Sequence, residues 1–203
     1  TYVQFEIFRA FSCVVKGPSI SSSNFSFDFQ LWECLEERKQ FNFIERDHAS
    51  RLDLIAKVRG LKEAEDYISK IPASFRKEIV YRTLLSHYVS VSDVKKAEKI
   101  FNKMRDWGFP LSSFTCDQLL LLYSRTARNK IVSVLSLMVR ENVKLSQRTY
   151  STLIDAKGRS GNREGMEKVV MTMKADGIEP DSVTKSILAK HYALFGLKPP
   201  AGL

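Results

Sequence analysis

Hydrophobic positions in the second half of the chain recur with the period of an amphipathic helix and stop at turn-forming residues. In the stretch 147–181, QRTYSTLIDAKGRSGNREGMEKVVMTMKADGIEPD, this pattern predicts one helix over Arg148–Arg159 and a second over Arg163–Ala175. A Ser-Gly-Asn turn separates the two, and Gly177, followed closely by a Pro-Asp pair, ends the second helix. Such a hairpin leaves one apolar face uncovered, so it must stack on a neighbour.

Copies of this hairpin are present at spacings of 34 or 35 residues, as the numbering shows. Five columns share the register: a tyrosine or lysine, a leucine, a threonine or valine, a methionine, and a glycine or asparagine. The columns are Tyr88, Tyr123, Lys157 and Tyr192; Leu84, Leu119, Leu153 and Leu188; Val80, Thr115, Thr149 and Thr184; Met104, Met138 and Met173; and Gly108, Asn142 and Gly177. Asparagine replaces glycine once because it also tolerates the left-handed conformation that ends a helix. The sequence therefore predicts stacked helical hairpins.

The spacing also divides the chain. The predicted repeats are 45–77, 78–112, 113–146, 147–181 and a partial fifth repeat, 182–203. The first ends at Ile71-Pro72 rather than at glycine, so we expect its loop to differ. Residues 1–28 are predicted to be an N-terminal extension or linker, and 29–44 a helix that caps the end of the stack, because an end repeat has a face without a neighbour.

The repeat unit resembles that of the pentatricopeptide repeat proteins of plant organelles. Thr149–Ala156 and Gly177–Asp181 match the motif of that family closely, and the resemblance covers roughly residues 45–195. The tetratricopeptide repeat has a similar period, but its W-x2-L-G-x2-Y pattern does not occur in register here. The resemblance implies an all-α fold, a right-handed α-solenoid of helix-turn-helix repeats.

In this arrangement the recurring apolar positions form the core, and we assign them no further function. The predicted core residues are Leu84, Leu85, Tyr88, Ala97, Ile100, Phe101, Met104, Leu119, Leu120, Tyr123, Leu135, Met138, Leu153, Ile154, Val169, Val170 and Met173.

Charge indicates the kind of partner. The net charge is +9, which favours a polyanion, and the third repeat and the last segment carry +3 each. Three scattered cysteines and three histidines lack the spacing of metal ligands, and no phosphate-binding loop, acidic pair or nucleophile motif occurs. The sequence therefore predicts a protein that is not an enzyme and has no cofactor or metal.

The resemblance implies which residues face RNA. In helical repeats that bind RNA, two or three side chains of each repeat meet one base. In this family the fifth and last residues of a unit contact the base edge, and the second lies between neighbouring bases. In this sequence the pairs that the resemblance places at the base edge are Arg82 with Ser112, Asp117 with Ser146, and Ser151 with Asp181. The residues that it places between neighbouring bases, which we call wedge residues, are Ile79, Phe114, Arg148 and Val183. Ser151 with Asp181 resembles the pair that favours guanine, whereas the other two pairs depart from the usual ones.

A basic residue near the end of the first helix recurs in several repeats. Lys57, Arg125 and Arg159 occupy the position where the family carries a cation that faces phosphate. The alternative is a solvated cation that offsets the negative end of the helix dipole.

The resemblance implies a single-stranded RNA partner, an organellar intron, in the chloroplast, with the mitochondrion as the alternative. The short proteins of the thylakoid assembly eight type, which promote group II intron splicing, are the subgroup that the chain is most similar to in length and repeat number. Other splicing factors are possible partners, and the protein is expected to be a monomer or an RNA-dependent dimer, with no membrane segment. Two alternatives stay open: an RNA stability or translation factor, and a protein adaptor whose groove, lined by Asp117, Asp155 and Asp181, holds a basic partner.

Overall fold

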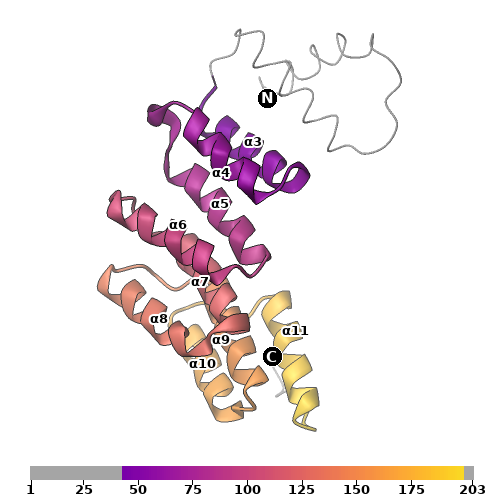
Figure 1. The fold of residues 1–203 in the computed structure, drawn as a ribbon. Coiled ribbons are helices and arrows are strands. Elements are labelled where there is room, and N and C mark those ends of the chain that lie inside the picture. The colour runs from indigo at the N-terminus through magenta and orange to yellow at the C-terminus, as the bar shows by residue number, and fades with distance from the viewer. Residues whose placement is uncertain (1–42, 199–203) are drawn as a thin grey trace, which may run out of the picture. The chain divides into compact units, whose positions relative to one another are not determined.

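The computed structural model describes residues 43–198 of the protein. The predicted extension 1–28, and all but the last two residues of the predicted capping segment 29–44, lie outside this range. Within it the chain forms nine α-helices and two short 3₁₀ turns and has no strand (Figure 1). None of the helices in this range is long and apolar enough to span a bilayer.

The chain divides into two compact units, Thr1–His87 and Tyr88–Leu203, and the division falls inside helix α5 (Glu78–Ser90). The first unit holds α3 (Glu45–Val58), α4 (Leu61–Lys70), the 3₁₀ turn η1 (Ala73–Phe75) and most of α5. This turn occupies the loop that we expected to differ, after Ile71-Pro72. The packing of α3 on α4 buries Leu52 and Ala64 completely.

The second unit contains the second helix of the second repeat, the helix pairs of the third and fourth repeats, and the single helix of the fifth. Its helices are α6 (Val94–Asp106), α7 (Ser113–Thr126), α8 (Ile131–Arg140), α9 (Gln147–Arg159), α10 (Arg163–Ala175) and α11 (Ser182–Leu194). The predicted bounds of α9 and α10 agree with the structure to within one residue. We call α7, α9 and α11 the first helices of their repeats, and α6, α8 and α10 the second helices.

The second helices end as the repeated glycine or asparagine column predicts. Gly108, Asn142 and Gly177 have φ values of 70°, 53° and 75°, in the left-handed region. The N–H of the next residue donates to a carbonyl five residues earlier, which belongs in each case to the repeated methionine. This bond satisfies a carbonyl that the helix end would otherwise leave without a partner.

Successive first helices pack on one another, since α9 contacts α7 on one side and α11 on the other. In the third and fourth repeats the second helix packs on the first helix of its own repeat, α8 on α7 and α10 on α9. The core of the last repeats contains Tyr150, Ile154, Met166, Val170, Met173, Leu188 and Tyr192. The predicted core is buried except for Leu135, Leu153 and Val169, which are partly buried.

Tyrosines of the repeated column join neighbouring repeats. The Tyr123 hydroxyl donates to a carboxylate oxygen of Glu98, 2.6 Å away, and the Tyr192 hydroxyl donates to Glu167 at 3.0 Å. Both bonds run from a first helix to the second helix of the preceding repeat. Burial together with this bond raises the pKa of the Tyr123 hydroxyl, so it stays protonated as a donor.

Helix α8 departs from the pattern of the other second helices. Asp93 and Asn162 cap α6 and α10 through their side chains, whereas α8 follows a 3₁₀ turn, η2 (Arg128–Lys130), without a side-chain cap. Its first residue, Ile131, corresponds to Ala97, which lies three residues inside α6. Helix α8 therefore lacks the first turn that its counterparts have.

Candidate nucleic-acid interface

The last residue of each predicted repeat begins the first helix of the next. The side-chain oxygens of Ser112, Ser146 and Asp181 accept bonds from the backbone N–H three residues later, at 3.3, 3.1 and 2.8 Å. Ser and Asp are favoured at this position because their oxygens satisfy an N–H that the first turn cannot. The predicted reading residues thus lie in one row, at the starts of α7, α9 and α11.

Threonines of one repeated column lie directly beneath this row. Thr115, Thr149 and Thr184 are 1%, 0% and 0% exposed. The Thr184 hydroxyl donates to Asp181 at 2.7 Å, and the hydroxyls of Ser112 and Thr115 lie 2.9 Å apart. These threonines therefore orient the predicted reading residues from below. The sequence showed the column, but its register alone gave no sign of this role.

The predicted pair of Asp117 and Ser146 is joined directly. The Ser146 hydroxyl donates to one carboxylate oxygen of Asp117 at 2.6 Å, and the Thr149 hydroxyl donates to the other at 2.5 Å. Asp117 is only 3% exposed, and its burial raises the pKa of the carboxyl despite the two hydroxyl donors. Both oxygens of Asp117 are thus already bonded within the protein.

The predicted pair of Ser151 and Asp181 is connected through Thr184. The Ser151 hydroxyl lies 2.7 Å from the Thr184 hydroxyl, which donates to Asp181. Ser151 is buried, whereas Asp181 is exposed. Hydrogen bonds from the backbone and then the side chain of Thr184 lower the pKa of Asp181. A carboxylate that is ionised at neutral pH therefore stands at the surface of the fourth repeat.

Arg82, whose predicted partner is Ser112, lies in the first unit. Its guanidinium is 3.6 Å from the carboxylate of Glu78 in the preceding turn of α5, and the side chain is half-buried.

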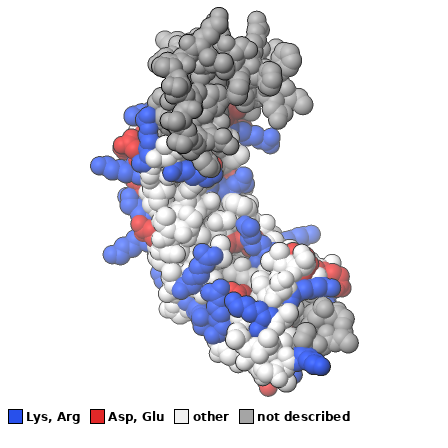
Figure 2. Space-filling view, turned by 90° about the vertical axis from the view of Figure 1, so that its right-hand side faces the viewer, with Lys and Arg blue, Asp and Glu red and all other residues white. Residues whose placement is uncertain are grey.

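The predicted wedge residues follow the helix starts by one position. Phe114 and Val183 are 38% and 61% exposed, Arg148 is exposed, and Ile79 in the first unit is half-buried. The second unit therefore presents two apolar side chains and one cation beside the row of helix starts. Figure 2 shows many more Lys and Arg than Asp and Glu side chains on the visible surface of the lower part, which the second unit forms.

The predicted phosphate-facing residue of the first repeat is held in an ion pair. Lys57 Nζ lies 2.6 Å from one carboxylate oxygen of Asp53, and His87 Nε2 lies 2.8 Å from the other. Asp53 belongs to α3 and His87 to α5, which are the first helices of the first two repeats, so the carboxylate links two successive first helices.

The fourth repeat has the same arrangement. Arg159 lies 2.5 Å from one oxygen of Asp155, and His191 Nε2 of α11 lies 2.9 Å from the other. The aspartate is in each case four residues before the basic residue, and the histidine comes from the next first helix. His87 and His191 therefore have a common role, since each bonds an aspartate of the preceding first helix.

Arg125 differs from Lys57 and Arg159. The residue four positions before it is Leu121, so the first helix of the third repeat offers no carboxylate. Arg125 is exposed, and across residues 43–198 it takes part in no ion pair. It is therefore the most available cation of the three for a phosphate.

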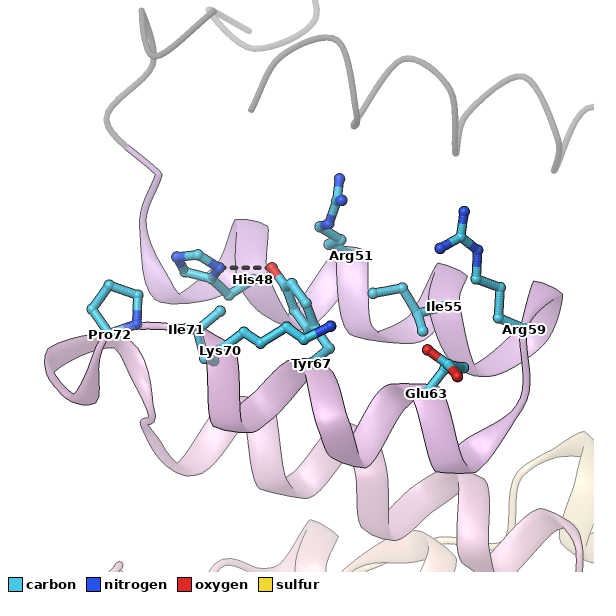
Figure 3. Close-up of a pocket in the computed structure, with 9 residues that line it drawn as sticks. All are labelled: His48, Arg51, Ile55, Arg59, Glu63, Tyr67, Lys70, Ile71 and Pro72. Carbon is cyan, nitrogen blue, oxygen red and sulfur yellow. Dashed lines mark hydrogen bonds between the residues drawn. The ribbon is translucent and has the colours of Figure 1, made fainter. Parts of the chain in front are cut away.

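A pocket in the first unit was not predicted. It has a volume of about 350 Å³ between α3 and α4 and is lined by His48, Arg51, Ile55, Arg59, Glu63, Tyr67, Lys70, Ile71 and Pro72 (Figure 3). His48 Nδ1 lies 2.9 Å from the Tyr67 hydroxyl, and burial lowers the pKa of His48. Figure 3 shows Arg51 of α3 and Arg59, the residue after its end, projecting in the same direction. The pocket holds none of the predicted reading residues, and we assign it no role in base recognition.

Family models confirm the repeats. A pentatricopeptide repeat domain model matches residues 133–193, and a model of the PPR repeat family matches residues 76–125. The chain belongs to the pentatricopeptide repeat family.

Several members of this family are similar over most of the chain. The pentatricopeptide repeat-containing protein At1g15480, mitochondrial, of Arabidopsis thaliana is 54% identical over 172 residues, which are 85% of this chain and 29% of that protein. The pentatricopeptide repeat-containing protein At1g80270, mitochondrial, of the same plant is 52% identical over 172 residues, again 85% of this chain and 29% of that protein. This chain thus spans less than a third of the length of these relatives.

A solved pentatricopeptide repeat structure has the same fold. The crystal structure of PPR10 in complex with an 18-nt psaJ RNA element superposes with a TM-score of 0.65 at 17% identity, over 83% of this chain and 27% of that one. The prediction of an all-α solenoid of helix-turn-helix repeats is therefore confirmed.

Proposed function

We propose that this pentatricopeptide repeat protein binds single-stranded RNA, without catalysing a reaction, along the starts of its first helices. The observation that carries the proposal is the row of Ser112, Ser146 and Asp181 in the second unit. Each is fixed as a helix cap, and each is followed two residues later by a wedge residue, namely Phe114, Arg148 and Val183. PPR10, which shares the fold, was crystallised with RNA.

In this proposal each repeat meets one base. The cap residue faces the base edge, the wedge residues separate neighbouring bases, and Arg125 faces the phosphate backbone. Two exposed apolar wedges, Phe114 and Val183, suit contact with base faces, since stacking needs no particular hydrogen bonds.

The repeats differ in how much sequence information they offer. Asp117 has both carboxylate oxygens bonded to hydroxyls, so the third repeat has little left for a base edge. Asp181 is exposed and ionised, and a carboxylate can accept from the N1–H and N2–H₂ donors of guanine. We therefore propose that the fourth repeat carries the strongest base preference.

We expect Asp181→Asn to shift preference at one base from guanine towards adenine. Asparagine offers a donor and an acceptor, and a good bidentate contact is worth about 1–3 kcal/mol of discrimination in duplex recognition. It is also as good a helix cap as aspartate, so the start of α11 is retained. The measurement is the affinity for RNA oligonucleotides in which each position is varied in turn.

Glu179→Gln is the matched control. Glu179 is exposed, lies two residues before Asp181 and loses the same charge, but it does not begin a helix. This variant should rank the four bases as the wild type does. If Asp181→Asn also ranks them unchanged at every position, the fourth repeat does not read sequence.

Arg125 and Arg159 should contribute unequally to phosphate binding. We expect Arg125→Ala to weaken all RNA sequences alike and to reduce the slope of log K against log salt by about one. Arg159→Ala should change the slope less, because Asp155 already pairs with Arg159. Equal slopes for the two variants would contradict the difference that we draw from their ion pairs.

We further propose that the RNA is mitochondrial rather than of the chloroplast, which was our first expectation, because the relatives reported above are named mitochondrial. Group II intron splicing, other splicing factors as partners and an RNA-dependent dimer remain hypotheses within this proposal. Sequencing the RNA that co-purifies with the protein from mitochondria tests it. Recovery of intron-containing transcripts would support splicing, whereas recovery of mature transcripts alone would favour a stability or translation factor.

A further inference from the structure

Gln147, the first residue of α9, contacts the start of the next first helix. Its side-chain amide Nε2 donates to the Thr184 hydroxyl at 3.1 Å. The backbone and then the side chain of Thr184 lower the pKa of Asp181 most, and a hydrogen bond from the Gln147 side chain adds to them. Gln147 is half-buried and lies one position before the wedge residue Arg148. It is not among the residues that the sequence placed at a base.

The Thr184 hydroxyl has three polar neighbours. Besides Gln147, it lies 2.7 Å from the Ser151 hydroxyl and 2.7 Å from Asp181 Oδ1. A hydroxyl group has one hydrogen to donate and two lone pairs that accept. Because the amide nitrogen of Gln147 can only donate, the Thr184 hydrogen points to one of the other two neighbours. The bond to the charged carboxylate is the stronger of these, so Gln147 helps to direct this hydrogen to Asp181.

The third repeat joins the same elements differently. There the fifth residue, Asp117, accepts from both Ser146 and Thr149. The first residue of that repeat, Ser113, has a much shorter side chain than glutamine. The link from the third repeat to the next helix start is thus made by a buried carboxylate, both of whose oxygens are bonded.

The fourth repeat makes this link with neutral groups. Its fifth residue is the small Ser151, and the amide of Gln147 supplies a second contact to the next helix start. The carboxylate in this part of the fold belongs instead to Asp181, which is exposed. The protein therefore holds the Asp181 carboxylate from one side with donors and leaves it accessible from the other.

We propose that Gln147 is a positioning residue for base recognition: together with Thr184 it holds the Asp181 carboxylate in the orientation that meets guanine. The inference rests on the proposed function, in which Asp181 accepts from the N1–H and N2–H₂ donors of guanine. A carboxylate that is free to turn can also accept from the amino groups of adenine and cytosine. Fixing its orientation therefore increases the preference for guanine.

Two substitutions test the donor. Gln147→Met keeps the length of the side chain but removes the amide. Gln147→Glu replaces the donor by an acceptor, which competes with Asp181 for the single Thr184 hydrogen and adds a second negative charge. Met and Glu are good helix formers, an acidic residue is favourable in the first turn, and Ser146 rather than Gln147 caps α9. We therefore expect both variants to match the wild type in urea denaturation.

The first measurement follows the Asp181 carboxyl carbon by NMR while the pH is lowered, on the full chain without RNA. Loss of the donor should raise the pKa of Asp181 in Gln147→Met, because a hydrogen bond to the charged form is lost. The added negative charge should raise this pKa further in Gln147→Glu. A pKa of Asp181 that is the same in all three proteins would overturn the inference, whatever the protein binds.

The second measurement is the affinity for single-stranded RNA oligonucleotides that carry each base in turn at the position where Asp181→Asn changes the preference. The ratio of the affinities for guanine and adenine should fall about threefold in Gln147→Met and about tenfold in Gln147→Glu, as expected for one lost hydrogen bond and one opposing charge. Ser113→Glu is the control, because it adds the same charge at the same position of the third repeat. It should weaken the four oligonucleotides alike and leave this ratio unchanged.

The outcomes separate this inference from the proposed function. If the wild type prefers guanine and Gln147→Met keeps that preference in full, Gln147 does not position the carboxylate. A ratio that falls as far in Ser113→Glu as in Gln147→Glu would assign the effect to charge alone. If the wild type ranks the four bases equally at every position, base reading by the fourth repeat fails, and this inference fails with it even where the titration shows a shift.

Discussion

Replacing Leu119 by alanine is expected to lower the free energy of unfolding by about 2–5 kcal/mol. Leu119 is 2% exposed in α7, between the second helices of two repeats, and each repeat depends on its neighbours for stability. The substitution removes buried methyl groups and leaves a cavity that rigid helices fill only in part. Urea denaturation followed by circular dichroism measures the change.

Leu153→Ala provides the comparison. Leu153 occupies the same column one repeat later, and the sequence predicts equal burial, but the structure leaves it partly exposed. Its replacement should therefore cost clearly less than that of Leu119. Equal losses for the two variants would contradict the packing described here.

Gly158→Ala is expected to destabilise the protein by about 1–3 kcal/mol, although alanine is normally the better helix residue by about 1 kcal/mol. A methyl group at Gly158, in the last turn of α9, would overlap the buried imidazole ring of His191 in α11. The imidazole is held in place by its bond to Asp155. The overlap should therefore outweigh the gain in helix propensity.

A double-mutant cycle isolates this effect. In a His191→Ala background the ring is gone, so Gly158→Ala should be neutral or should stabilise α9 by up to about 1 kcal/mol. Chemical denaturation of the four proteins gives the coupling free energy. A loss of the same size in both backgrounds would show that the contact between Gly158 and His191 is not the cause.

Periodicity was sufficient to predict the repeats and most of their helices. The bounds of α9 and α10 could be predicted because turn residues end a helix through their own backbone conformation, which needs no distant contact. The left-handed helix ends at Gly108 and Gly177 could be predicted for the same reason. The 3₁₀ turn before α8 was not predicted. It accompanies a spacing from Tyr123 to Met138 that is one residue shorter than the corresponding spacing in the neighbouring repeats, and no single residue marks it.

The exposure and bonding partners of the candidate site residues were less predictable, because they depend on contacts between repeats. Asp117 and Asp181 look alike in the sequence, but one is enclosed by Ser146 and Thr149 and the other lies at the surface. Whether a cation near the end of a first helix is paired depends on the residue four positions earlier and on the next first helix.

These contacts also bear on the adaptor alternative. It requires Asp117, Asp155 and Asp181 to face a basic partner together. Asp117 is buried, and Asp155 is bonded to Arg159 and His191. Only Asp181 of the three is exposed, so the acidic groove that this alternative needs is not formed.

The most direct test of RNA binding is the affinity of the full chain for single-stranded RNA, measured from low to physiological salt. The row of helix starts and the net charge of +9 predict that log K falls linearly with log salt, because phosphate contacts release counterions. The same strand annealed into a duplex should bind more weakly, because its bases are then unavailable to the wedge and cap residues. An affinity that does not change with salt, or that is equal for single strand and duplex, would contradict the account.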